Sequence, residues 1–167
     1  MSRLDLNAGH SEEYIDKLSK QGLVINKSVT LDLPQLPADI SSVSDGELMA
    51  LFSQITAFTN FLNTQLSCAE IDERRAEKNL GAVEDHAMIR EHSGKAAKDT
   101  VTFLKTKIAA DPEVMKARED YESKYAYRKL IDSMADNASR DAMLVSRELT
   151  RRTAGSNANT RGQRMFA

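Results

Sequence analysis

The sequence is poor in the residues that make turns and aromatic cores. Its 167 residues include no tryptophan, one cysteine, three prolines and seven glycines, and aromatic residues make up 5%. So few aromatic side chains suit helix–helix packing better than a sheet core. So few glycines and prolines leave room for few turns, which predicts long elements. The single thiol, Cys68, excludes a disulfide framework within the chain and fits a reducing compartment.

Long apolar runs are also missing. No stretch reaches the roughly 18 apolar residues that a membrane-spanning helix needs. The first residues, MSRLDLNAGHSEEY, lack the apolar segment of a signal peptide. We therefore expect no membrane partner and a cytoplasmic location.

Apolar residues at helical spacing are plentiful. Ser44 and Glu47 fit a capping box, in which each side chain satisfies a free backbone amide at the start of a helix. A heptad stripe follows, with one four-residue step after Leu62 that locally unwinds a supercoil. Without that step, the stripe would instead include Gln65 and Asp72. The residues on the predicted stripe are Leu48, Leu51, Ile55, Phe58, Leu62, Leu66, Ala69, Ala76, Leu80, Val83 and Ala87.

A second helical stretch follows a turn at residues 92–95 and covers residues 96–110. Asp111-Pro112 is then a strong helix-start signal, which marks either a break or a kink in one helix. The heptad returns from Val114, and the helix is expected to end near Thr153–Gly155. The side chains expected to pack against another helix or another subunit are Tyr121, Tyr125, Ile131, Ala135, Ala138, Ala142 and Val145.

The N-terminal part reads differently. Residues 1–10 show no periodicity and are expected to be loose. Residues 11–22 predict a short helix that ends at Gly22. Residues 23–40 contain Pro34 and Pro37, which favour an extended arm or an ordinary linker. The apolar anchors of such an arm would be Leu31, Leu33, Leu36 and Ile40.

These patterns predict an all-α fold: a long antiparallel, coiled-coil-like helical hairpin with a short N-terminal helix and an extended, proline-containing arm. The expected parts are residues 1–43 for the helix and arm, 44–154 for the hairpin, and 155–167 for a flexible basic tail. Two helices alone leave apolar side chains uncovered, which favours a homo-oligomer or coverage by the arm. The uncovered side chains include Tyr121, Tyr125, Tyr127, Leu130 and Met134.

No catalytic or metal-binding pattern emerges. His86 and His92 are six residues apart and Cys68 is distant from both, so no ligand cluster forms. No nucleophile lies at a useful spacing from a base. We therefore expect neither an enzyme nor a metal or other cofactor.

The charge is unevenly distributed. The chain as a whole is −2, but its last 21 residues hold five arginines against one glutamate. Cations near a helix C-terminus interact favourably with the helix dipole, which explains Arg147, Arg151 and Arg152. The rest suit phosphate contacts with a stacking phenylalanine, an acidic groove of a neighbouring subunit, or an idle tail. The candidate nucleic-acid-binding residues are Arg147, Arg151, Arg152, Arg161, Arg164 and Phe166.

The order of these features resembles a known family. A capped long helix, a Gly/Lys turn, the segment ADPEV at residues 110–114 and the ending DAMLVSRELTRR at residues 141–152 are similar to small helical proteins of tailed bacteriophages. The named family with this layout is the UvsY-like recombination mediators, and the resemblance covers about residues 47–153. It implies a homo-oligomer in the host cytoplasm that binds single-stranded DNA and helps to load a recombinase. The arm and tail depart from that layout.

An arm and a tail that reach outward also suit a different function. Subunits of a phage particle use such segments as clasps on other virion subunits. The alternative is therefore a structural or assembly subunit located in the virion.

Overall fold

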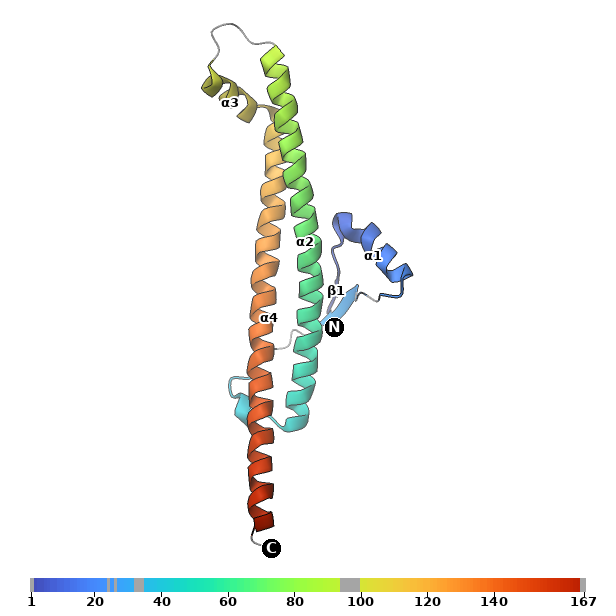
Figure 1. The fold of residues 1–167 in the computed structure, drawn as a ribbon, viewed down its shortest axis with the longest axis vertical. Helices are drawn as coiled ribbons and strands as arrows, with labels where there is room; N and C mark the ends of the chain where they lie inside the picture. The colour runs from blue at the N-terminus through green and yellow to red at the C-terminus, as the bar shows by residue number, and fades with distance from the viewer. Residues whose placement is uncertain (1, 24, 26, 32–34, 94–99, 166–167) are drawn as a thin grey trace. The chain divides into compact units, whose positions relative to one another are not determined.

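The computed structural model describes residues 2–23, 25, 27–31, 35–93 and 100–165 (Figure 1). The predicted all-α hairpin class is confirmed, because the long helices α2 (Asp45–Ser93) and α4 (Pro112–Met165) pack against each other. The chain divides into two compact units, and each long helix contributes a segment to both. Unit 1 consists of Met1–Leu6, Ile25–Thr64 and Asp132–Ala167, and unit 2 consists of Asn7–Val24 and Gln65–Ile131.

The core of unit 1 lies along the predicted heptad stripes of α2 and α4. Leu48 and Ile55 of α2 pack with Val145 of α4, and all three are almost completely buried. A neighbouring cluster joins Phe58 and Leu62 to alanines 135 and 138 of α4. The small side chains of these alanines allow the two helices to approach closely.

The arm packs along this hairpin segment, as predicted. Leu36 and Ile40 contact the Leu48 cluster, and a single turn of 3-10 helix, η2 (Ile40–Ser42), leads into α2. The side chain of Leu31 and the whole of Leu33 lie outside the described residues. The capping box at the start of α2 is also present, since the amide of Glu47 donates to Ser44 Oγ over 3.3 Å and the amide of Ser44 donates to a Glu47 carboxylate oxygen over 3.1 Å.

Two short strands form an additional element of unit 1. β1 (Ser2–Asp5) pairs antiparallel with β2 (Ser28–Leu31), with Ser2 opposite Leu31 and Asp5 opposite Ser28. Val29 of β2 packs against the Phe58 cluster. The prediction that residues 1–10 are loose was therefore wrong. Four-residue strands are too short to show a hydrophobic alternation, and their pairing depends on a partner more than 20 residues away.

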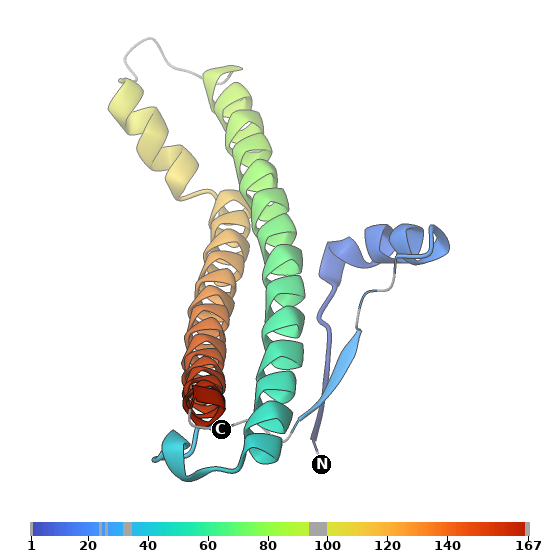
Figure 2. The same ribbon diagram turned by 60° about the horizontal axis from the view of Figure 1, so that its bottom comes forward.

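Unit 2 contains the predicted helix restart at Pro112. α3 (Val101–Ala109) ends before Asp111, whose carboxylate accepts from the amide of Glu113 over 2.9 Å at the start of α4. Asp111-Pro112 is thus a break rather than a kink, and α3 leaves the line of α4 (Figure 2). Residues 94–99, which include the second half of the expected turn and the start of the expected helix, lie outside the described residues.

The long-helix segments of unit 2 are joined by apolar and ionic contacts. Ala87, Ile108 and Val114 form the buried cluster, with Leu80 and Val83 against it. Arg128 pairs with Glu73, and Arg118 donates to Glu84 over 2.9 Å. Arg128 of α4 thus has an acidic partner on the neighbouring helix α2.

The segment before α1 (Glu12–Lys20) is bound to a polar face of α2 in the same unit. Gln65 Oε1 accepts from the amide of Asn7 over 2.8 Å, and Gln65 Nε2 donates to the carbonyl of Asn7 over 2.9 Å. Asp72 accepts from the amide of His10 over 3.0 Å. Gln65 and Asp72 lie outside the apolar heptad stripe of α2, yet both side chains are buried. They are buried because the N-terminal segment covers them.

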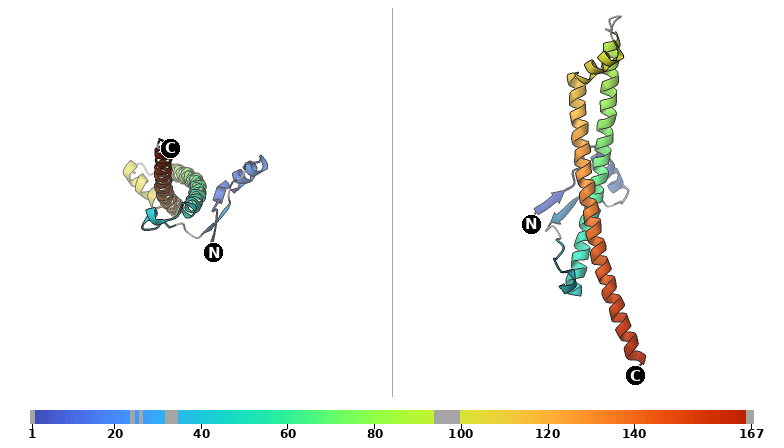
Figure 3. Two further views of the ribbon diagram at one scale, coloured as in Figure 1. Left: turned by 90° about the horizontal axis from the view of Figure 1, so that it is seen from below. Right: turned by 90° about the vertical axis from the view of Figure 1, so that its left-hand side faces the viewer.

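The predicted end of the last helix was wrong, because α4 continues through Gly155 to Met165. Extending a formed helix adds one hydrogen bond per residue, and a single interior glycine costs only about 1 kcal/mol relative to alanine. In unit 1, Arg152 of α4 contacts Asp45 at the start of α2. Residues 153–165 therefore extend beyond that end of α2 by about 20 Å (Figure 3). No helix in the described part of the chain is long and apolar enough to cross a membrane.

Candidate nucleic-acid interface on α4

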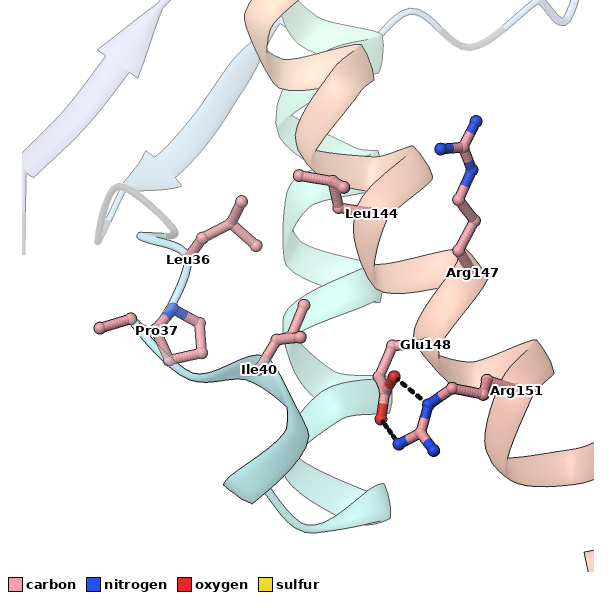
Figure 4. A pocket seen from close by; sticks show the side chains of 8 residues that line it. Leu36, Pro37, Ile40, Leu144, Arg147, Glu148 and Arg151 are labelled. Carbon is pink, nitrogen blue, oxygen red and sulfur yellow. Dashed lines mark hydrogen bonds and ion pairs between the residues drawn. The ribbon is translucent and has the colours of Figure 1, made fainter. Parts of the chain in front are cut away.

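A cavity of about 340 Å³ lies in unit 1 between the arm and the C-terminal half of α4. The arm provides an apolar wall, and α4 provides one leucine and three charged side chains. Figure 4 shows the two walls facing each other across the cavity. The lining residues are Leu36, Pro37, Ala38, Ile40, Leu144, Arg147, Glu148 and Arg151.

Glu148 is held by two arginines. Both carboxylate oxygens accept hydrogen bonds of 2.7 Å from Arg151, and Oε1 also accepts one of 2.7 Å from Arg152. These bonds, those of Arg151 first, hold the pKa of Glu148 at about 2. The carboxylate is therefore ionised at neutral pH and its charge is compensated.

Because the pKa of Glu148 is lowered, part of the free energy of unfolding depends on pH in the acid range. Above the ordinary glutamate pKa of about 4.5 the ionised carboxylate stabilises the fold, and this stabilisation is lost as the pH falls from there towards 2. We expect Glu148→Gln to lower stability near neutral pH and to reduce the loss of stability between these two pH values. Urea unfolding at a series of pH values measures both. Parallel curves for the two proteins across the acid range would contradict the expectation.

Arg152 has a structural role that the sequence did not reveal. Its guanidinium donates to the carbonyls of Ile40, Ser41 and Val43 over 2.7 to 3.1 Å and to Asp45 Oδ1 over 2.7 Å. Its side chain is only 18% exposed. Arg152 thus joins the turn before α2 to α4, and its donors are not directed towards a ligand. The prediction that it contacts phosphates is not supported by this geometry.

Arg147 and Arg151 remain available on the cavity wall. Arg147 is exposed and makes no hydrogen bond or ion pair with any residue in the described ranges. Arg151 uses part of its guanidinium on Glu148, yet its side chain is 67% exposed. The structure therefore brings together two of the six predicted residues beside one cavity.

The other three predicted residues lie further along. Arg161 and Arg164 are in the extended part of α4, but their side chains lie outside the described part of the chain, as does the whole of Phe166. The sequence contains no acidic residue after Glu148. The last turns of α4 therefore carry two arginines, no acidic residue and otherwise uncharged side chains in the sequence.

The predicted packing residues fall into two groups. Four of them are buried in the chain itself: Ile131, Ala135, Ala138 and Val145. Ala142 is partly buried against the Leu48 cluster. Tyr121 and Tyr125 instead form a ring contact, with centroids 6.3 Å apart, on a partly exposed surface. Only the tyrosines therefore remain candidates for contact with another subunit.

Sequence reasoning missed the arm side of the cavity and the role of Glu148. Leu36 and Ile40 were identified as anchors, but the residues of α4 opposite them could not be known. A glutamate three and four residues before two arginines is a recognisable signal for helical ion pairs. That spacing could have predicted that Arg151 and Arg152 each form an ion pair with Glu148.

No group of three or more His, Cys, Asp or Glu side chains in the described ranges is placed to hold a metal ion. Burial raises the pKa of the Cys68 thiol, which keeps it protonated and poorly reactive. Comparison of the chain with protein-family models, with curated proteins and with solved structures finds no match.

Proposed function

We propose that this chain is a non-enzymatic protein that binds single-stranded nucleic acid through the C-terminal half of α4. The observation that supports the proposal is the exposed Arg147, which has no partner in the described ranges, beside Arg151, whose side chain is 67% exposed. The helix that carries them continues with Arg161 and Arg164 and has no later acidic residue. Exposed arginines on one helix suit the phosphates of a nucleic-acid backbone, whose release of counterions drives binding.

The arm favours this function over a virion clasp. A clasp must leave its own chain to bind a neighbour. Here Leu36 and Ile40 pack on the Leu48 cluster of the same chain, and Arg152 ties the carbonyls of Ile40 and Ser41 to α4. The arm is therefore occupied within the subunit.

The proposal includes self-association and a role as a recombination mediator that helps to load a recombinase. The resemblance to UvsY-like mediators suggests that role. In unit 2, Tyr127 and Leu130 of α4 are exposed and, being three residues apart, share a helical face, which supports contact with a second copy. Exposed large apolar side chains of this kind favour association when they are close together.

The basic end of α4 provides the test of nucleic-acid binding. We expect the double substitution Arg161→Ala and Arg164→Ala to weaken binding to a labelled oligothymidylate and to reduce the slope of log K against log salt by about 1.4, or about 0.7 for each lost contact with a single-strand phosphate. Fluorescence anisotropy at several salt concentrations measures both quantities. The matched control is Arg74→Ala with Arg75→Ala, which removes the same charge from exposed positions of α2.

Two results would contradict the proposal. The first is an equal loss of affinity for the oligothymidylate in the two double variants, which would show that only the net charge of the protein matters. The second is the absence of binding at low salt by the unaltered chain. In that case a large, defined mass by light scattering would favour the assembly subunit. A comparison with duplex DNA of the same sequence tests the preference for single strands.

A further inference from the structure

We infer that the cavity between the arm and α4 receives an unpaired base of the bound strand, with the neighbouring phosphate on Arg147. This inference rests on the proposed function and adds the source of its preference for single strands. It assigns separate tasks to the two walls of the cavity in unit 1.

The apolar wall fits the face of a base. Leu36, Pro37 and Ile40 of the arm oppose Leu144 of α4, and Figure 4 shows these side chains around the cavity mouth. A volume of about 340 Å³ is at the small end of ligand sites, which span roughly 300–1,000 Å³. A flat, weakly polar base is an occupant of that size, and its transfer from water to an apolar wall is favourable.

The charged wall fits an anion next to that base. Glu148 would repel a phosphate, but Arg151 and Arg152 compensate its charge. Arg147 has no partner among the residues that the structure describes, and the exposed part of Arg151 lies one helical turn further along, about 6 Å. The lining therefore combines apolar side chains with two arginines against one glutamate, and Asp39 of the arm lies near that glutamate. Apolar side chains beside arginines match the alternation of base and phosphate along a strand.

The same geometry excludes a paired base. In a duplex, each base is stacked on its neighbours and hydrogen-bonded to its partner, so its faces are not accessible to a side pocket. Only an unpaired strand can place a base between the arm and α4. The discrimination between single strands and duplexes then requires no hydrogen bonds to the base edges, so we expect a weak preference for particular base sequences.

A second cavity in the same unit provides a contrast. It has about 260 Å³ and is lined by Gln35, Ile55, Phe58, Met134, Asn137, Ala138 and Asp141. It has a similar apolar character, but its charged side chain is an acid and no arginine lines it. A nucleic-acid strand should therefore avoid it, and it offers a matched control position. Met134 is 44% exposed and Leu144 is 50% exposed, and both lie on α4.

The experiment compares an oligothymidylate with an abasic oligonucleotide of equal length, which has the same phosphates and no bases. We expect Leu144→Gln to weaken binding of the oligothymidylate roughly fivefold or more, the loss typical of one base contact. Binding of the abasic strand should change less than about twofold. Met134→Gln should leave both affinities unchanged. Circular dichroism of each variant verifies that the fold is retained.

The proposed contact between Arg147 and a phosphate is tested by a separate substitution. Arg147→Ala should weaken the binding of both strands alike and reduce the salt slope by about 0.7. Its control is Arg140→Ala, an exposed arginine two turns earlier on the same helix, which should have a smaller effect. Equal effects of these two substitutions would overturn the assignment of Arg147.

The outcomes separate this inference from the proposed function. One outcome is that binding depends on salt but Leu144→Gln weakens the oligothymidylate and the abasic strand equally. This outcome would overturn the inference that the cavity receives a base and would leave the proposed function intact. No binding of either strand by the unaltered chain would overturn both. Stronger competition by an acidic, leucine-containing peptide than by unlabelled oligothymidylate would assign the cavity to a protein segment instead.

Discussion

Replacing Arg152 with alanine is expected to lower the thermal unfolding midpoint more than replacing Arg151, although the two arginines are adjacent and carry the same charge. Arg152 donates to three backbone carbonyls of residues 40–43 and to two carboxylates, at Asp45 and Glu148. Its removal leaves carbonyls of the turn before α2 without this donor, which is more costly than losing a pair whose arginine is 67% exposed and whose glutamate keeps a second arginine. Among the described residues, Arg151 donates to Glu148 alone.

Thermal melts followed by circular dichroism measure the midpoints, and hydrogen exchange at residues 40–48 reports local loosening. Arg152→Lys is a useful intermediate, because lysine keeps the charge but cannot present the same planar set of donors. We expect its midpoint to lie between those of the unaltered chain and the alanine variant. Equal midpoints for Arg151→Ala and Arg152→Ala would show that charge, rather than the network, is what stabilises this end of unit 1.

Replacing Gly9 with alanine is expected to release the N-terminal segment from α2 in unit 2. Gly9 has φ +47°, and a Cβ there would collide with the carboxylate of Asp72. The left-handed conformation alone costs a non-glycine residue roughly 1–2 kcal/mol. The collision adds to this cost, since the carboxylate must move away from the amide of His10 that it binds. We therefore expect faster proteolysis within α1 and faster hydrogen exchange at His10.

Two variants distinguish the collision from the backbone conformation. Gly22 has φ +84° but no neighbouring atom near its Cβ position, so Gly22→Ala incurs only the conformational cost. Shortening Asp72 to alanine in the Gly9→Ala background removes the collision, and the two substitutions should then be non-additive. Strict additivity would show that the close approach of Gly9 to Asp72 is not what limits this position.

Features that depend on neighbouring residues in the sequence were predictable. The capping box of Ser44 and Glu47 is local, and so is the restart at Asp111-Pro112, because a helix end needs partners within three or four residues. The heptad stripe gave the buried face of both long helices in advance, from Leu48 to Ala87 and from Val114 to Val145. Periodicity of side chains along a helix fixes which of them share a face, whatever the partner is.

Features that depend on distant partners were decided only by the tertiary structure. Gln65 and Asp72 lie off the apolar stripe, yet both are buried because the segment before α1 covers them. Arg147 and Arg152 are equivalent in sequence as cations near a helix end, but one is exposed beside a cavity and the other is bound to the turn before α2. A charge count records the number of cations and not their hydrogen-bond partners. The sequence by itself determined the long helices and their apolar stripes, although not where the last helix ends. Contacts between segments more than 100 residues apart determined that Arg152 is bound to the turn before α2 while Arg147 is exposed.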